Sequence, residues 1–305
     1  MSFASRIPVY RRVLVPLDGS PFGEQALPYA EAVARAARGR IVLVHAHELP
    51  VDIEGVAIDL ASDAVMRDRA RAYLEEVAAA IASRADVPVA TRPMVGRPAV
   101  MVEVAVRDVG AELVVMSTHG RTGLARAWLG SVADELVRRL EVPLLLVRPA
   151  ERGGRAGERV EFEEIVVALD GSLLSERILP HAAAFGRPDR TRYTLVRVVP
   201  PELVVGGHVL RLDEARAREL VSKAEAYLSG VAGTLRPQAA EVRTRVVKHT
   251  APAAVILEVA AAAGADLIAM TTHGYGGLKR LMLGSTSDKV LRGADVPVLV
   301  NRPGE

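Results

Sequence analysis

The stretch RRVLVPLDGS (Arg11–Ser20) recurs, 152 residues later, as EEIVVALDGS (Glu163–Ser172). Two more stretches repeat at a spacing of 154 residues: ELVVMSTHG (Glu112–Gly120) returns at Asp266–Gly274, and the block that begins at Trp128 returns at Met282. Solenoid repeats are about 20 to 45 residues long, so a period of this size indicates two tandem domains instead of an array.

The repeat also sets the domain boundaries. The segment 150–161 (AERGGRAGERVE) lies between the copies and is charged, rich in glycine and poor in apolar residues, which is typical of a linker. The sequence therefore predicts a first domain over residues 1–149, a linker over 150–161 and a second domain over 162–305.

Each copy alternates short apolar runs with longer helical patterns. In the first copy the runs are Val13–Leu17, Ile41–His45, Pro88–Val95, Leu113–Met116 and Leu144–Val147. The helical patterns are Ser20–Gly39, with a kink at Pro28, then Arg69–Arg84, Pro98–Val109 and Ser131–Leu140. Uninterrupted Val, Leu and Ile indicate strands buried on both faces, so we expect an α/β fold of two doubly wound domains, each a five-stranded parallel sheet flanked by helices.

Composition excludes several classes of protein. The chain has 305 residues and no cysteine, which excludes disulfides and Cys-ligated metals and favours a cytoplasmic location. It has no apolar stretch long enough for a signal sequence or a membrane span. The formal net charge is only +2 and aromatic residues make up 4% of the chain, so we expect no nucleic-acid partner and no membrane partner.

Two strand ends carry residues suited to ligand binding. In open α/β sheets, ligands bind beyond the carboxyl ends of the strands, where the strand order reverses. The first strand ends in Asp18-Gly19-Ser20 and its twin in Asp170-Gly171-Ser172. We expect Ser20 and Ser172 to cap the following helix, and the two aspartates either to join that cap or to contact a ligand.

The fourth strand of each copy leads into a glycine-containing loop. Ser117-Thr118-His119-Gly120 is followed after nine residues by Gly130-Ser131, and Thr271-Thr272-His273-Gly274 after nine residues by Gly284-Ser285. Free backbone N–H groups at a helix start favour an anion, so the repeated spacing predicts a phosphate site. Neither a G-x-x-x-x-G-K-[ST] loop nor a G-x-G-x-x-G motif is present, which argues against P-loop NTPases and dinucleotide dehydrogenases.

Two other readings of the polar residues are weaker. His45 and His47 share one strand face and could ligate a metal, but the pair lacks a third ligand and the second copy has Arg197 and Val199 instead. A Ser-His-Asp hydrolase could combine Ser131, His119 or His273, and Asp18, but the serine is not on a nucleophile elbow.

These motifs together resemble the tandem-domain members of the universal stress protein family. The resemblance rests on VPLDGS, THGRTG, LGSVADELVR and the closing VPLLLVRP, and it covers nearly the whole chain apart from the linker and the ends. It implies the adenine nucleotide alpha hydrolase-like fold. The ATP-binding branch of that family carries G-x2-G-x9-G-[ST], of which this chain keeps the last three elements and has Ser117 and Thr271 at the first glycine.

The resemblance also implies a nucleotide site in each copy. The strand-one aspartate would lie beside the ribose, adenine against the backbone of Ala46 or Val198, and the phosphates on the loop and helix start. Arg121 would reach the phosphates in the first copy, whereas the second has Tyr275 there. The full set of expected nucleotide-binding residues is Pro16, Asp18, Ala46, Ser117, His119, Gly120, Arg121, Gly130, Ser131, Val132, Asp170, Val198, Thr271, His273, Gly274, Gly284, Ser285 and Thr286.

The resulting expectation is an ATP-binding, stress-response regulatory protein with one site per domain. The cofactor would be ATP with magnesium, with no metal held directly by the protein and no catalytic residue, so hydrolysis would be slow or absent. The alternatives are a scaffold of the same fold that binds no nucleotide, and an ATP-dependent enzyme. The last strands, Pro143–Val147 and Pro297–Asn301, would pair as an intramolecular pseudo-dimer. A homodimer and a regulatory protein partner of unknown identity are also expected.

Overall fold

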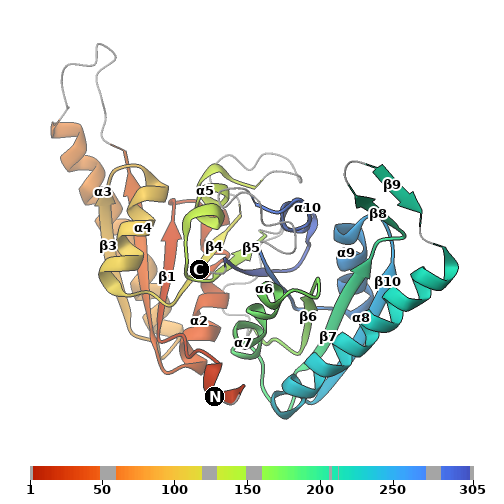
Figure 1. Ribbon diagram of the computed structural model, residues 1–305. Helices are drawn as coiled ribbons and strands as arrows, with labels where there is room; N and C mark the ends of the chain where they lie inside the picture. The colour runs from red at the N-terminus through yellow and green to blue at the C-terminus, as the bar shows by residue number, and fades with distance from the viewer. Residues whose placement is uncertain are drawn as a thin grey trace. The chain divides into compact units, whose positions relative to one another are not determined.

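A computed structural model describes residues 3–48, 60–118, 129–148, 160–205, 208–211, 213–272 and 283–302. The chain forms two compact units (Figure 1). The N-terminal unit is Val9–Val160, and the C-terminal unit is Glu161–Glu305 together with Met1–Pro8. Most of the predicted linker, residues 150–159, lies outside the described part of the chain.

The N-terminal unit is built on five parallel strands. They are β1 (Arg12–Leu17), β2 (Arg40–His47), β3 (Val89–Val95), β4 (Leu113–Ser117) and β5 (Leu144–Val147). Within this unit the strand order is β3-β2-β1-β4-β5, and every pairing is parallel. The chain moves from β1 toward β3 in one direction and returns on the other side of β1 as β4, so the order reverses between β1 and β4.

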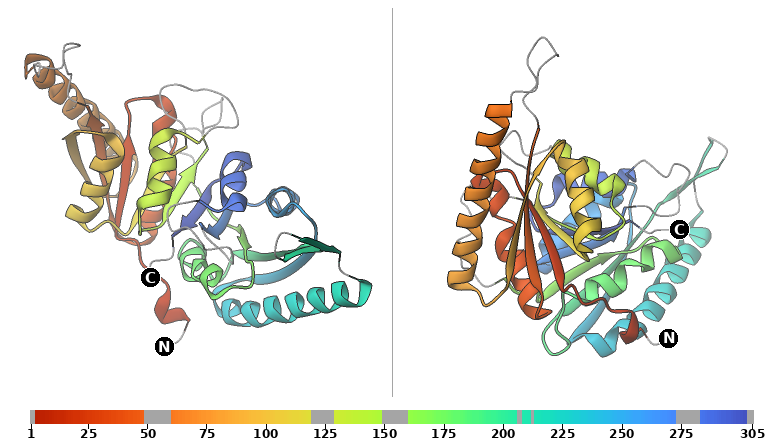
Figure 2. Two further views of the ribbon diagram at one scale, coloured as in Figure 1. Left: turned by 45° about the horizontal axis from the view of Figure 1, so that its top comes forward. Right: turned by 90° about the vertical axis from the view of Figure 1, so that its left-hand side faces the viewer.

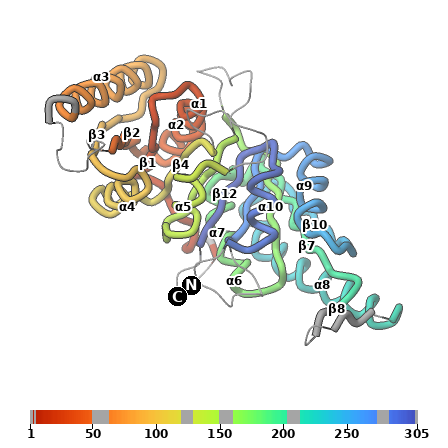
Figure 3. The backbone as a smooth tube through the Cα atoms, turned by 90° about the horizontal axis from the view of Figure 1, so that it is seen from above, coloured from red at the N-terminus to blue at the C-terminus, as the bar shows by residue number. Residues whose placement is uncertain are grey.

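Helices cover both faces of this sheet. They are α1 (Pro21–Glu24), α2 (Leu27–Ala36), α3 (Leu60–Arg84), α4 (Pro98–Val109) and α5 (Ser131–Arg139). Figure 3 shows α2 and α3 on one side of the row of strands and α4 and α5 on the other. The doubly wound α/β fold predicted from the sequence is therefore present.

Three details differ from the sequence-based expectation. The helix expected over Ser20–Gly39 is two helices, α1 and α2, because Pro28 stands in the first turn of α2 and not inside a continuous helix. Helix α3 begins nine residues before Arg69. Strand β3 has no fully buried residue, and it stands at the edge of its unit with β2 as its one neighbour there.

The C-terminal unit repeats the arrangement. Its strands are β6 (Glu164–Ala168), β7 (Arg192–Val199), β10 (Glu241–Lys248), β11 (Leu267–Thr271) and β12 (Val298–Asn301), in the order β10-β7-β6-β11-β12. Its helices are α6 (Leu173–Glu176), α7 (Ile178–Ala183), α8 (Glu214–Leu235), α9 (Pro252–Ala263) and α10 (Ser285–Gly293). Figure 2 shows α8 on one side of this sheet and α9 with α10 on the other.

The second copy also contains an element that the repeat does not predict. Between β7 and α8 lies an antiparallel hairpin of β8 (Glu202–Val205) and β9 (His208–Arg211), which forms a separate two-stranded sheet. None of the described helices is both long enough and apolar enough to cross a lipid bilayer.

The cores lie between each sheet and its helices. Leu14, Leu145 and Leu299 are fully buried, as expected for strands covered on both faces. Burial of these Leu, Val and Ile side chains is the main stabilising term and holds the carboxyl ends of the central strands in fixed positions.

Candidate functional site

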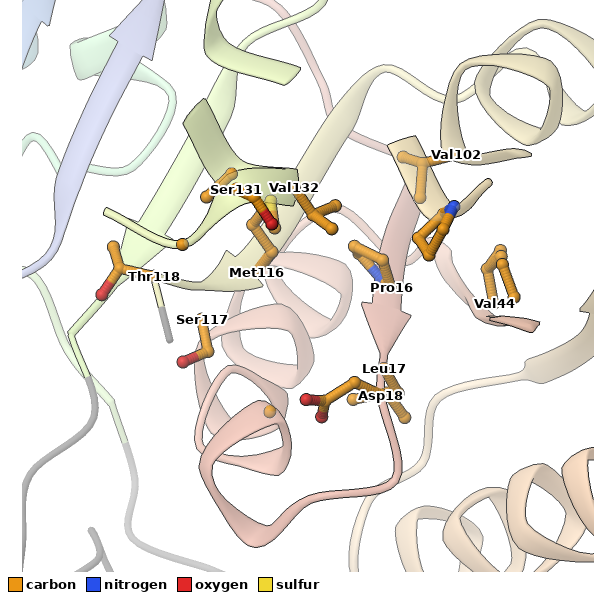
Figure 4. A pocket seen from close by; sticks show the side chains of 15 residues that line it. Pro16, Leu17, Asp18, Val44, Val102, Met116, Ser117, Thr118, Ser131 and Val132 are labelled. Atoms are coloured by element: carbon orange, nitrogen blue, oxygen red, sulfur yellow. The ribbon is translucent and has the colours of Figure 1, made fainter. Parts of the chain in front are cut away.

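A pocket of about 260 Å³ opens at the carboxyl edge of the N-terminal sheet, where the strand order reverses between β1 and β4 (Figure 4). Its lining comes from the ends of β1, β2 and β4, from the turn after β1 and from the starts of α4 and α5. The lining residues are Pro16, Leu17, Asp18, Gly23, Val44, Ala46, Pro98, Val102, Met116, Ser117, Thr118, Gly130, Ser131, Val132 and Ala133.

The pocket has an apolar end and a polar end. Figure 4 shows Pro16, Val44 and Val102 grouped at one side. At the other side lie Ser117, Thr118 and Ser131, and Asp18 stands below the two groups. An elongated ligand with a flat apolar part and an anionic part matches this division.

The polar end includes the start of α5. Gly130 precedes the helix with extended backbone angles and supplies no side-chain cap. The N–H groups of Ser131, Val132 and Ala133 belong to the first turn of the helix, where no intrahelical acceptor is expected, and Gly130 supplies no capping side chain; all three residues line the pocket. These donors and the helix dipole favour an anion at this point.

One expected phosphate donor is already occupied. The N–H of Gly130 donates to the carbonyl of Thr118 at 2.8 Å, and the N–H of Gly284 donates to the carbonyl of Thr272 at 3.0 Å. Both bonds tie the helix start to the preceding strand. In this structure the two glycine N–H groups are therefore occupied, and the next residues of each helix are the candidate phosphate donors.

The turn after β1 fixes Asp18. Gly19 has a φ of 79°, a conformation that favours glycine, and this reverses the chain so that Asp18 Oδ1 accepts from the backbone N–H of Ser20 at 3.0 Å and from its hydroxyl at 2.6 Å. The Ser20 hydroxyl in turn accepts from the Gly23 N–H at 3.1 Å, which confirms its predicted role as a helix cap.

The same turn occurs in the C-terminal unit. Asp170 Oδ1 accepts from the N–H and hydroxyl of Ser172 at 2.9 and 2.6 Å, and Ser172 caps α6. A Cβ at Gly171, where φ is 90°, would lie 2.6 Å from the guanidinium carbon of Arg197. That guanidinium lies over the ring of Tyr227 at 5.0 Å, so it is held against the turn.

The two histidines of β2 each have a partner in the protein. His45 Nδ1 lies 3.0 Å from the carbonyl of Leu17, and its ring meets Tyr73 edge-on. His47 Nε2 lies 3.1 Å from Asp63 Oδ1. A hydrogen bond from Arg67, followed by that from His47, lowers the pKa of Asp63.

These contacts assign the histidines to packing around the site. Within the described residues there is no group of three or more His, Cys, Asp or Glu side chains that could hold a metal ion.

The structure brings seven of the expected binding residues together in one pocket: Pro16, Asp18, Ala46, Ser117, Gly130, Ser131 and Val132. Asp170, Val198, Thr271, Gly284, Ser285 and Thr286 occupy the matching strand ends and helix start of the C-terminal unit. His119, Gly120, Arg121, His273 and Gly274 lie outside the described residues. The Ser-His-Asp hypothesis requires His119 or His273, so the described residues do not test it.

Sequence reasoning included Pro16 and Ala46 but missed four other apolar residues of the pocket lining. Val44 and Met116 belong to strand runs, and Pro98 and Val102 lie in the first turns of α4. In the sequence each is indistinguishable from an ordinary core residue. Their only available signal is position: all four lie near the carboxyl end of a strand or just after one.

Comparison with known proteins identifies the class to which this fold and pocket belong. Residues 9–148 and 161–302 each match the universal stress protein family. The chain therefore belongs to that family, with two of its domains in tandem.

Individual relatives support the same family assignment. A universal stress protein of Mycobacterium tuberculosis is 33% identical over 193 residues, which is 63% of this chain and 62% of that protein. One from Thermus aquaticus is 32% identical over 141 residues, covering 46% of this chain and all of that protein. A crystal structure of a universal stress protein from Archaeoglobus fulgidus has a TM-score of 0.69 and 22% identity, covers 97% of this chain and 99% of its own, and shares the fold.

Proposed function

We propose that this protein is an ATP-binding regulatory protein of the stress response, with ATP and magnesium as its ligand and with little or no hydrolysis. The observation that carries the proposal is the two-ended pocket of the N-terminal unit. Its apolar side suits a nucleobase, and its polar side contains the first-turn residues of α5, whose N–H groups have no side-chain cap from Gly130.

Asp18 supports the same assignment. It stands below the two ends of the pocket in Figure 4, within reach of a ribose that joins base and phosphates, and its position is fixed by the turn that ends in Ser20. Ser117 replaces the first glycine of the family's ATP-binding motif, yet it lies in the pocket wall at the end of β4 without closing the pocket. A side chain at this position is therefore compatible with a ligand.

The proposal that the protein is not an efficient enzyme follows from the same lining. Asp18 is the only ionisable side chain among the described residues that line the pocket. It is hydrogen-bonded to Ser20, and a single carboxylate supplies neither a pair of metal ligands nor a separate acid and base. Magnesium bound with ATP would be held chiefly by the phosphates.

The simplest test examines what the protein carries when it is purified. Heat-denaturing the purified chain and separating the supernatant by ion-exchange chromatography should release an adenine nucleotide. A supernatant free of nucleotide, together with no ATP binding by calorimetry, would contradict the proposal and favour the alternative, an interaction scaffold of the same fold.

A further inference from the structure

The two units allow their sites to be compared residue by residue. β1 and β6 end in the same turn, and α4 and α9 both have twelve residues, begin with proline and end at a left-handed glycine with φ of 61° and 63°. Pro16 pairs with Val44 as Ala168 pairs with Val196, so β2 and β7 are in the same register. Each of the fifteen residues that line the N-terminal pocket therefore has a defined counterpart.

The counterparts are not equal in size. Eight are identical, and Val132 is matched by Thr286, which has nearly the same volume. Five are larger in the C-terminal unit: Gly23 becomes Ser175, Ala46 becomes Val198, Val102 becomes Ile256, Ser117 becomes Thr271 and Ala133 becomes Ser287. Only Pro16 has a smaller counterpart, Ala168, and the five larger side chains add more atoms than that exchange removes.

Two of the larger residues belong to the apolar side. Val102 stands at this side in Figure 4, and Ala46 follows Val44 by two residues on β2, so the two share a face of that strand. Their counterparts, Val198 and Ile256, are β-branched and stiff about χ1. Ile256 is 4% exposed, so it is held by its neighbours.

The polar side of the C-terminal site carries hydrogen bonds that the N-terminal site lacks. The Ser287 hydroxyl donates to the carbonyls of Thr271 and Thr272 at 3.1 and 3.3 Å, and the Ser175 hydroxyl donates to the carbonyl of Ser172 at 2.8 Å. Ala133 and Gly23 can make no such bonds. These hydroxyls therefore fasten the C-terminal turn and loop to their own backbone.

We infer that the chain binds one adenine nucleotide, in the N-terminal unit, and that Val198 and Ile256 exclude the nucleobase from the C-terminal site. This inference rests on the proposed function and narrows the one-site-per-domain expectation. A change of one methylene in a binding pocket alters affinity by about 10- to 200-fold. On the apolar side Val198 and Ile256 add three carbons, and the exchange of Pro16 for Ala168 removes two, so the C-terminal site has one carbon more there. By the same measure this net carbon lowers the affinity of the C-terminal site for the nucleobase by about tenfold or more.

The test counts sites by titrating ATP into nucleotide-stripped full-length protein in magnesium buffer. The parent should bind one ATP per chain. A46V/V102I, which gives the N-terminal pocket the C-terminal residues, should bind none, and V198A/I256V, which does the reverse, should bind two. Thermal unfolding of each variant checks that the fold is intact.

The outcomes separate the two proposals. Two sites in the parent overturn the inference and leave the proposed function standing, whereas no sites in the parent overturn the proposed function. One site that survives A46V/V102I also overturns the inference, because the site would then lie elsewhere. If V198A/I256V unfolds, the single variant I256V replaces it, with a second, weaker site expected.

Discussion

At the scale of single residues, His181 shows how a partly buried group makes stability depend on pH. It lies in α7, and burial lowers its pKa to about 4 from an ordinary value of 6.5. The folded unit therefore favours neutral imidazole. Above about pH 6.5 the free energy of unfolding does not depend on this group. As the pH falls from 6.5 toward 4 the free energy of unfolding decreases, because His181 takes up a proton when the protein unfolds.

The aligned residue in the N-terminal unit is Tyr29, so His181→Tyr is a matched exchange. We expect the parent to lose up to about 1.4 kcal/mol of stability per pH unit through His181 as the pH falls below the ordinary pKa of histidine. The variant should lack this pH dependence. Thermal unfolding between pH 7 and pH 4.5 measures it. Parallel curves for parent and variant would show that His181 is not the responsible group.

A second prediction at the scale of single residues concerns Asp18 and the rate of ATP turnover. Because it is the sole ionisable residue of the described pocket lining, we expect ATP turnover far below the roughly 1 per second found at the slow end of ordinary enzymes. Phosphate release in the presence of magnesium measures turnover. A robust rate that disappears in Asp18→Asn, but persists in Asp170→Asn, would show that the N-terminal unit is an enzyme.

At the scale of elements, the start of α5 is the feature that most directly defines the site. Gly130 has φ of −58° and ψ of 148°, and Gly284 has −60° and 140°, which are angles that any residue adopts. Backbone conformation therefore does not require glycine at these positions. At Gly284 space is limited, since a Cβ there would lie 3.0 Å from the Thr272 carbonyl oxygen, closer than most Cβ contacts.

We accordingly expect Gly130→Val to weaken ATP binding by about tenfold or more, because the side chain enters the approach to the free N–H groups. Gly284→Val is the matched control, with affinity unchanged if the nucleotide lies in the N-terminal unit. Calorimetry measures both, and circular dichroism confirms the fold. Equal affinity in Gly130→Val and the parent would place the anion site elsewhere.

At the scale of the whole molecule, the association of the two units remains a prediction. β5 and β12 each end their unit's own strand order and are fully apolar apart from Asn301. Unpaired apolar strands at a sheet edge are prone to associate, and a linker of a dozen residues reaches about 20 Å, enough to allow pairing within one chain.

Cleaving the chain tests this prediction. A protease site inserted into residues 150–159 should be cut without separating the halves, which should elute together in size-exclusion chromatography. Because Met1–Pro8 belongs to the C-terminal unit, a second variant lacking these residues shows whether they alone hold the halves together. If the halves separate even in the variant that retains Met1–Pro8, edge pairing is ruled out.

The sequence by itself determined the duplication, the α/β class and the positions of most strands and helices, because each depends on local pattern: apolar runs, capping residues and a repeat period. It also located Asp18, Ser117 and Gly130, because these stand at strand ends and a helix start. Only the tertiary structure placed Val44, Val102 and Met116 in the pocket wall and showed that the Gly130 N–H is bonded to Thr118. Those facts depend on which elements meet in space, and contacts between residues distant in sequence leave no local pattern to read.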